Sequence, residues 1–426
     1  MIIKSINMKR FFFAVFAACA ALTSYAQGYA ELIKANPAMA AANLMNYHFE
    51  KSIYTPAPKG YEEFYISHYG RHGSRYDASD ANMTAIWPVM KLADSLDILT
   101  EVGKEFYKEF NEVMLEQDGM IGMLTGLGAK EHRGIAERMA ANFPKVFRGK
   151  DGRNIIFCQS SPVPRCIMSM TNFVHSLAHN TSGLDYSFVT GDKYYDQLAY
   201  HPPVRMGSKI ASAKEDSLRR AVMKPMNIVS YFFSDVEKAK QIIGDPFDFE
   251  KQLYLACSVG HLSDYGTCLL KYFPEDILIA NWEVRNARFF TAYGMAKETA
   301  QYQLEVSRRV TQDFLKRAEE AIDEGNNVAA DLRFGHDTGL MPFAGYIGVE
   351  GFEERPSFAD VNSVMNTSVS MCMGSNIQFV FYRNKQGDIL VKILFNEKET
   401  KINGLSPISG PYYKWSDLKA HFKSLI

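Results

Sequence analysis

The sequence predicts an α/β fold with a mostly parallel central sheet flanked by helices and with an inserted helical cap domain. A strand, a polar loop and a helix follow one another three times, with strands near 64–66, 154–158 and 328–334. The amphipathic stretch 304–322 precedes the third strand, as a crossover helix does. Residues 377–383 and 388–395 flank a polar turn and predict a hairpin. Between about 195 and 300, aromatic helical segments punctuated by proline predict the cap.

The first 26 residues have the pattern of a secretory signal peptide, because basic residues precede an apolar run from Phe11 to Leu22. That run is too short to span a bilayer comfortably, so we expect an exported protein, periplasmic or secreted, with no transmembrane segment. Lipid anchoring at Cys19 is the less favoured alternative, since Phe16 fits poorly at the first position of a lipoprotein cleavage site.

The length of the chain indicates how many domains it has, and its charge indicates which classes of partner it can bind. A chain of 426 residues is longer than one hydrophobic core usually holds, so two domains are expected. Residues 27–194 and 301–426 are assigned to the α/β domain and 195–300 to the cap, and a contribution of 80–145 to the cap is left open. The 47 Lys and Arg residues do not exceed the 48 Asp and Glu residues, which argues against nucleic acid as a partner. A small phosphorylated molecule is the expected partner, and the oligomeric state is left open.

The loop after the first predicted strand holds a distinctive group of residues, Arg71, His72 and Arg75. Arginine matches phosphate oxygens with two parallel donors. A neutral histidine beside it can act as a nucleophile that carries a phosphoryl group. Phosphoryl transfer is therefore the leading hypothesis.

The loops after the other two strands carry similar chemistry. The second strand leads into Arg165, and the third leads into His336 and Asp337. Thr338 is predicted as the N-cap of the helix that follows. Open α/β sheets bind ligands at the carboxyl ends of their strands. If the three strands are parallel neighbours, all six charged or imidazole side chains converge on one site.

These residues resemble those of a known family. The RHGxR pentapeptide at 71–75, the SSxxxR segment at 160–165 and the His-Asp pair at 336–337 are similar to clade two of the histidine phosphatase superfamily, which includes acid phosphatases and phytases. The segments 165–169 and 391–398 are most similar to the multiple inositol polyphosphate phosphatases. The resemblance implies a phosphoglycerate mutase-like α/β domain with an inserted helical cap.

The resemblance also implies a role for each residue of the site. His72 is the expected nucleophile, which forms a phosphohistidine, and Asp337 is the expected proton donor to the leaving group. The residues expected to bind the phosphoryl oxygens are Arg71, Arg75, Arg165 and His336. No metal and no other cofactor are expected, because the arginines supply the positive charge that Mg²⁺ supplies in other phosphoryl-transfer enzymes.

Two departures from the family pattern bear on the substrate. Asp77 stands where a proline usually closes the motif that begins at Arg71, which removes a rigid turn and adds a negative charge near the pocket mouth. The inositol polyphosphate phosphatases typically carry His-Ala-Glu where this chain has His336-Asp337-Thr338. Asp337 matches the acid phosphatase and phytase form instead.

The favoured substrates are inositol polyphosphates such as phytate, which would need additional basic residues in the cap. The candidates are Lys193, Arg205, Lys209 and Arg285, although single basic residues are more often ordinary surface charges. The first alternative is a broad-specificity acid phosphatase that acts on sugar phosphates or nucleotides. The second alternative, from another class, is a non-catalytic protein that binds phosphorylated ligands.

The remaining histidines are expected to be structural. His68 lies four residues before His72, but this segment lacks the helix and the glutamate of a zinc motif. His175 and His179 are expected on the solvated face of a helix, opposite its apolar stripe.

The cysteines do not predict a disulfide framework. Five remain after the signal peptide, an odd number spread widely along the chain: Cys158, Cys166, Cys257, Cys268 and Cys372. One bridge between Cys257 and Cys268, and five buried free thiols, are both left open.

Overall fold

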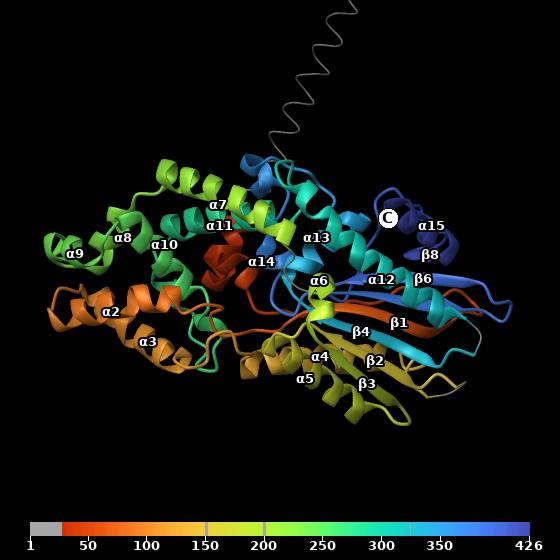
Figure 1. Cartoon of the computed structure of the whole chain (residues 1–426). Helices are drawn as coiled ribbons and strands as arrows, with labels where there is room; N and C mark the ends of the chain where they lie inside the picture. Colours follow the sequence, from red (N-terminus) through yellow and green to blue (C-terminus); the bar gives the residue numbers. More distant parts are fainter. Residues whose placement is uncertain (1–27, 150–151, 199–201, 324) are drawn as a thin grey trace, which may run out of the picture.

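A mixed sheet forms the centre of the computed structural model, which describes residues 28–149, 152–198, 202–323 and 325–426 (Figure 1). The strand order is β3-β2-β4-β1-β5-β6-β7, and β8 pairs with β6. The parallel strands are β1 (Glu62–Arg71), β2 (Ile155–Ser160), β3 (Asp185–Thr190) and β4 (Val328–Gly335). The antiparallel extension consists of β5 (Asn376–Arg383), β6 (Ile389–Phe395), β7 (Lys398–Glu399) and β8 (Tyr412–Lys414). The predicted fold class and the predicted hairpin, β5 with β6, are confirmed.

Helices cover both faces of the sheet. One face packs against α4 (Gly126–Asn142) and α5 (Pro164–Asn180), which lie below the sheet in Figure 1. The other face packs against α12 (Leu304–Ile322), α13 (Asp337–Ile347) and α15 (Trp415–Leu425). Side chains alternate between these faces along β1, so that Ile66 joins the first core and Tyr65 joins the second. The sheet is therefore the middle of three layers, as an α/β fold requires.

A group of helices continues beyond the sheet, at the left of Figure 1. It comprises α2 (Ala81–Ser95), α3 (Glu101–Gln117), α7 (Pro202–Val222), α8 (Pro225–Phe232), α9 (Val236–Ile242), α10 (Pro246–Cys257) and α11 (Glu275–Tyr293). Helix α10 packs on α2, and the Phe106 ring of α3 lies 4.7 Å from the Phe232 ring of α8. Segments from 80–117 and from 202–293 therefore lie together. We keep the division into an α/β domain and a cap as a proposal.

Short helical segments connect these layers. They are η1 (Pro37–Leu44), η2 (Asp192–Tyr194), α6 (Tyr195–Leu198), η3 (Gly260–Leu262), η4 (Leu269–Tyr272), η5 (Ala300–Tyr302), η6 (Phe358–Ser363) and α14 (Thr367–Ser370), together with helical residues 28–35. Segment η1 begins with Asn36 as its N-cap, and it packs on α11 and α14. The sequence did not predict this segment, which enters the site described below.

The possible bridge between Cys257 and Cys268 is wrong, because all five cysteines of the described residues carry free thiols. Cys257 ends α10 inside the apolar core, and Cys268 is partly buried just before η4. Burial raises the pKa of both thiols, which disfavours the thiolate that disulfide formation needs.

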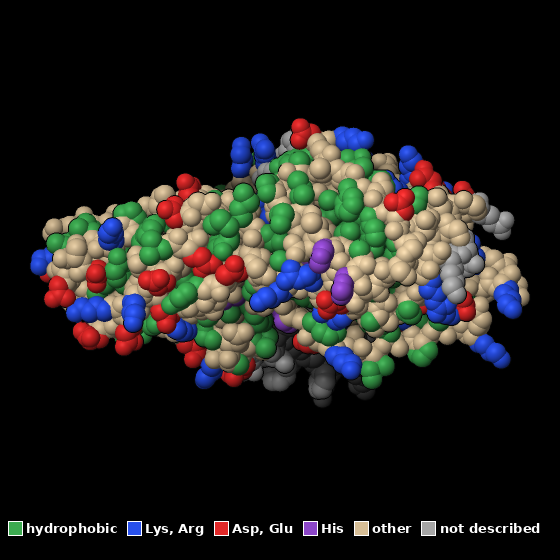
Figure 2. Space-filling view, turned by 90° about the horizontal axis from the view of Figure 1, so that it is seen from below, with side chains coloured by type: hydrophobic (Ala, Val, Ile, Leu, Met, Phe, Trp, Pro, Cys, Tyr) green, Lys and Arg blue, Asp and Glu red, His purple; other side chains and the backbone are tan. Residues whose placement is uncertain are grey.

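The predicted signal peptide, residues 1–26, and Cys19 lie outside the described residues. Within the part of the chain that the structure describes, none of the helices is long and apolar enough to cross a membrane. On the face shown in Figure 2, acidic and basic side chains are interspersed. This face therefore has no extended basic stripe of the kind that binds nucleic acid.

Candidate active site

Three neighbouring strands end at one level of the sheet and bring the predicted residues together. Arg71 at the end of β1 lies beside Gly335 at the end of β4, and Ser160 at the end of β2 lies beside Phe334. The backbone N–H of His72 donates to Gly335 O at 2.9 Å. The loops that follow these three strands therefore begin at the same edge of the sheet, as expected for parallel strands.

The hydrogen bond of the His72 imidazole leaves the lone pair on Nε2. Nδ1 lies 2.9 Å from Gly73 O, and a carbonyl oxygen can only accept, so Nδ1 carries the proton and Nε2 does not. The side chain is almost completely buried. Burial, followed by the positive charges of Arg165 and Arg71, holds the pKa of His72 well below its ordinary value of 6.5. The imidazole is therefore neutral in neutral and mildly acidic solution.

Three guanidinium groups surround this imidazole. Arg71 donates from Nη1 to Asn43 O at 2.6 Å and to Met371 O at 2.8 Å, and its Nη2 forms a 2.7 Å ion pair with Asp337. Arg75 donates from Nη1 to the carbonyl of Tyr76 at 2.8 Å. Burial, followed by the charge of Arg165, lowers the pKa of Arg75 to about 9.

The Nε donors of Arg71, Arg75 and Arg165 are buried and have no hydrogen-bond partner among the described residues. Buried polar groups are normally hydrogen-bonded, so three unpartnered donors beside one neutral imidazole require an explanation. Asp337, the carboxylate ion-paired with Arg71, carries less charge than the three guanidinium groups together. An oxyanion such as a phosphoryl group would provide both the missing acceptors and the missing negative charge.

His336 lies across the site from His72, with ring centroids 5.3 Å apart and the rings nearly perpendicular. Its Nε2 is 3.1 Å from Ser161 Oγ and 3.4 Å from Cys166 Sγ. Its Nδ1 faces Arg165 Nη2 at 3.5 Å, which is a weak contact. Burial, followed by the charge of Arg165, lowers the pKa of His336 to about 3.

Asp337 begins helix α13, and both carboxylate oxygens have donors. Oδ2 receives Arg71 Nη2 at 2.7 Å and Asn43 Nδ2 at 3.1 Å, whereas Oδ1 receives the backbone N–H of Thr338 at 2.9 Å. Burial raises the pKa of this carboxyl, but electrostatic interactions with Arg71, His336 and Arg75 outweigh burial and lower the pKa below 3.8. The predicted N-cap at Thr338 is wrong. The N-cap is His336, because the helix begins at Asp337, whose own carboxylate accepts the N–H of Thr338.

Three supporting residues were not predicted as part of the site. Asn43 lies in η1 and contacts Asp337, as described above. Glu131 of α4 accepts from the backbone N–H and the Oγ of Ser74, both at 2.7 Å, and burial raises its pKa to about 6. Ser169 of α5 accepts from the backbone N–H of Gly73 at 3.1 Å. Together, Glu131 and Ser169 fix the backbone of the two residues that follow His72.

Helix α4 packs directly against the loop that carries His72, and glycine is needed at this contact. A Cβ on Gly73 would lie 2.6 Å from Gly128 O, which no side chain tolerates. Asp77, which replaces the proline of the family motif, lies further along the same loop. Its carboxylate accepts from Asn82 at 3.2 Å, and its charge opposes the lowering of the pKa of Arg75.

The four basic candidates of the cap differ in position. Lys193, Arg205 and Lys209 are exposed on the surface. Arg285 of α11 is half-buried, and its Nη2 donates to Asn43 Oδ1 at 3.2 Å. Arg285 is therefore the candidate that reaches the residues around Asp337.

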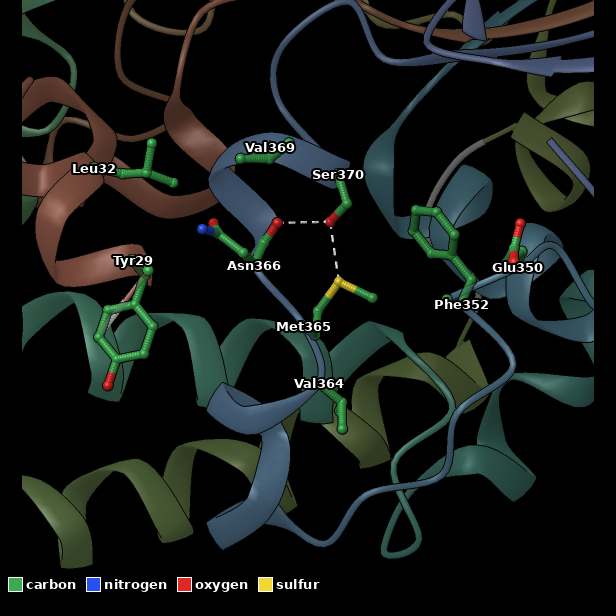
Figure 3. Close-up of a pocket in the computed structure, with 11 residues that line it drawn as sticks. Tyr29, Leu32, Glu350, Phe352, Val364, Met365, Asn366, Val369 and Ser370 are labelled. Atoms are coloured by element: carbon green, nitrogen blue, oxygen red, sulfur yellow. Dashed lines mark hydrogen bonds between the residues drawn. The ribbon is translucent and has the colours of Figure 1, made fainter. Parts of the chain in front are cut away.

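A separate hollow of about 740 Å³ lies between the helical residues 28–35 and α14 (Figure 3). Its lining includes Tyr29, Leu32, Phe352, Met365 and Val369, and none of the lining residues is Lys, Arg or His. This pocket therefore offers no charge that would attract a phosphate, and the candidate active site is the one at the strand ends.

No protein-family model matches the chain, and no curated protein matches it in sequence. Solved structures do match it in fold. The multiple inositol polyphosphate phosphatase of Bifidobacterium longum, in complex with inositol hexasulfate, has a TM-score of 0.70 at 20% sequence identity, over 89% of this chain and 97% of that chain. The phytase from D. castellii has a TM-score of 0.66 at 14% identity, over 91% of this chain and 84% of that chain.

The phytase of Hafnia alvei, in complex with myo-inositol hexakis sulphate, has a TM-score of 0.52 at 11% identity, over 87% of this chain and 98% of that chain. These likenesses cover most of this chain and most of each solved structure. They establish that this chain shares the fold of these phosphatases, as the sequence resemblance implied.

Proposed function

We propose that this protein is an exported phosphomonoesterase that acts through a phosphohistidine intermediate, with inositol polyphosphates such as phytate as its substrates. The observation that carries the proposal is the neutral, buried His72, which lies among Arg71, Arg75 and Arg165, whose Nε donors have no partner among the described residues. The fold shared with inositol polyphosphate phosphatases and phytases supports the same assignment. Export depends on residues 1–26, which have the pattern of a signal peptide.

The reaction would proceed in two displacements. His72 Nε2 forms a bond to phosphorus while the bond from phosphorus to the leaving oxygen breaks, and that oxygen takes a proton from Asp337. Water then attacks the phosphohistidine, which releases inorganic phosphate and restores the imidazole. The phosphoryl oxygens would lie against Arg71, Arg75, Arg165 and His336, which stabilise the charge that develops on them.

The proton that Asp337 donates must enter with the substrate or from acidic solution. The free enzyme holds Asp337 ionised, because Arg71 is ion-paired with it at 2.7 Å. A phosphomonoester whose second pKa is about 6 still carries one proton in mildly acidic solution. Transfer of that proton to Asp337 on binding would produce the dianionic phosphoryl group and the acid together. The proposal needs no metal or other cofactor, because the arginines supply the positive charge.

The substrate class rests on the cap and on the solved structures. The Bifidobacterium longum and Hafnia alvei enzymes were solved with sulfate analogues of inositol hexakisphosphate. Arg285 provides one cap cation beside the site, where it could meet a second phosphate of a polyphosphorylated ring. A broad-specificity enzyme would need no such contact.

Release of inorganic phosphate by the purified protein tests the proposal. We expect release from phytate that exceeds release from sugar phosphates and nucleotides at equal concentration. We expect His72→Ala to abolish release from all of them, while His175→Ala, which removes an exposed histidine of α5, retains it. Comparable rates on all esters would contradict the substrate class, and activity that survives in His72→Ala would contradict the mechanism.

A further inference from the structure

The segment that enters the site from the N-terminal part of the chain is held in an unfavourable backbone conformation. Ala42 has φ 52° and ψ −131°, a region that residues with a Cβ rarely occupy, and it is fully buried. Asn43 follows it and is also buried, in contact with residues of β1, α11 and α13. Such strain persists only where the surrounding structure holds the backbone in place, and it is often found at functional sites.

The backbone carbonyl, the side-chain Oδ1 and the side-chain Nδ2 of Asn43 each form a hydrogen bond. The backbone carbonyl accepts from Arg71 Nη1 at 2.6 Å, and the side-chain Oδ1 accepts from Arg285 Nη2 at 3.2 Å. Nδ2 donates to Asp337 Oδ2 at 3.1 Å. Arginine can only donate, so the amide oxygen must face Arg285 and the amide NH₂ must face Asp337. The chemistry of its neighbours therefore fixes the orientation of this amide.

We propose that Asn43 is a positioning residue that holds Asp337 for proton transfer through Oδ1, in the reaction proposed above, on which this inference rests. Among the described residues, Oδ2 is occupied by two donors, Arg71 and Asn43, whereas Oδ1 receives the backbone N–H of Thr338 alone. Oδ1 keeps a lone pair that can carry the transferred proton. Arg285 is linked to the acid through the amide of Asn43.

Several other groups face Asp337 and act on its ionisation. Arg71 and Arg75, in and after β1, and His336, next to it in the chain, favour the carboxylate. Two neutral groups also feel the charge of Asp337, the Tyr69 hydroxyl and the Cys166 thiol. Burial is the largest cause that raises their pKa values, and the charge of Asp337 raises them further. The Asn43 donor acts in the same direction as the arginines, so its removal should raise the pKa of Asp337.

Two variants of Asn43 test this role. Asn43→Asp keeps the size of the side chain and the acceptor for Arg285, but it places a second carboxyl beside Asp337. Two carboxyls at such a distance share a proton, which raises the pKa of the pair. Asn43→Leu removes the donor without adding a charge. Asn36→Asp is the matched control, because it makes the same charge change in the same segment and retains an N-cap acceptor for Ala38.

The readout is kcat/KM as a function of pH for an alkyl phosphate, which needs a proton donor, and for 4-nitrophenyl phosphate, which does not. We expect Asn43→Asp to move the alkaline limb upward by about one pH unit for the alkyl ester alone. We expect Asn43→Leu to lower kcat/KM about tenfold more for the alkyl ester than for the aryl ester. Asn36→Asp should leave both profiles unchanged.

The outcomes separate this inference from the proposed function. Equal losses on both esters in the Asn43 variants, with an unshifted alkaline limb, would show a merely structural role and overturn the inference. An unmodified protein that hydrolyses neither ester nor phytate would overturn the proposed function, and this inference with it. An active protein whose alkyl-ester profile shifts in Asn43→Asp supports both.

Discussion

Two buried histidines, His68 in β1 and His72 just after it, each belong to a pair of buried histidines, and the surroundings of the two pairs differ. The site pair, His72 and His336, has ring centroids 5.3 Å apart at the strand ends, among guanidinium groups. The core pair, His68 and His132, lies inside the layer between the sheet, α4 and α5. Each ring of the core pair lies within 6.5 Å of the rings of Phe173 and Phe334.

Burial alone does not distinguish the two pairs. It lowers the pKa of His68 to about 3 and that of His132 to about 4, and it also dominates the shifts of the site pair. The difference lies in the partners. Neither ring nitrogen of His68 has a hydrogen-bond partner in the described part of the chain, whereas His72 has its Nδ1 fixed by a carbonyl and its ring among the charges of three arginines. A neutral imidazole becomes a candidate nucleophile only where oriented charge surrounds it.

Removal of Arg165 should have the largest effect on the charged surroundings that distinguish the site pair from the core pair. Its charge is the strongest of those that lower the pKa values of His72 and His336. We expect Arg165→Met to lower kcat/KM for phosphomonoesters by on the order of a thousandfold, through the loss of an oxyanion donor. Steady-state kinetics measure this loss. Arg133→Met, which removes an arginine bonded to Asn172 between α4 and α5, is the control and should change the rate little. Equal losses in the two variants would contradict the assignment of Arg165 to the site.

Asp337→Asn tests the proposed proton donor beside the site pair, for which the core pair has no counterpart. We expect a loss on the order of a hundredfold in kcat/KM for alkyl phosphates, and a loss smaller than tenfold for 4-nitrophenyl phosphate. The reason is that a good leaving group departs without a proton. Parallel losses on the two esters would be inconsistent with Asp337 as the acid.

The pH profile of the unmodified protein follows from the directions of two pKa shifts. His72 has a pKa well below 6.5, so its imidazole stays neutral and nucleophilic as the pH falls through 6.5. Asp337 has a lowered pKa, so its protonated fraction rises as the pH falls. We expect kcat/KM for alkyl phosphates to increase by about tenfold from about pH 7.5 to about pH 5.5. A loss of activity with a midpoint near 6.5 on the acidic side would show that His72 titrates normally.

The core pair should affect stability rather than catalysis. The folded-state pKa of His68 is about 3 and its ordinary value is 6.5, so the unfolded chain gains the proton first and stability is lost as the pH falls below 6.5. We expect His68→Phe to avoid this loss and to raise the free energy of unfolding by about 2 to 3 kcal/mol at about pH 4.5, relative to the unmodified protein. At neutral pH the change should be below about 1 kcal/mol.

Urea denaturation at the two pH values measures this change, and His175→Gln on the exposed face of α5 is the control. His68→Phe should retain phosphatase activity. Loss of activity in a variant that remains folded would mean that the core pair takes part in the reaction.

The parts of the fold and site that could be predicted lie on short stretches of sequence. Strands β1, β2 and β4 each end in a polar loop, and the rule that parallel strands share a binding edge was enough to bring Arg71, Arg165 and His336 together. The exposed positions of His175 and His179 followed from the apolar stripe of α5.

The parts that could not be predicted depend on contacts between distant segments. Asn43 reaches Asp337 across 294 positions, and Glu131 reaches Ser74 across 57, so that neither position carries a local signal of its role. The N-cap at Thr338 was wrong because an Asp that accepts the next backbone N–H can start a helix as well as a threonine can. Local patterns identify the residues with chemistry, whereas the residues that orient them are found only in the folded structure.

The most direct test of the account is to trap the phosphoryl group on the protein. Rapid mixing with substrate, denaturation in alkali and mass spectrometry of the peptides should find one phosphoryl group on the peptide that contains His72, stable in alkali and lost in acid. Asp337→Asn should still form it with 4-nitrophenyl phosphate, and His72→Ala should not form it. Phosphate release by the unmodified protein with the phosphoryl group on another residue, or with undiminished release in His72→Ala, would contradict the account.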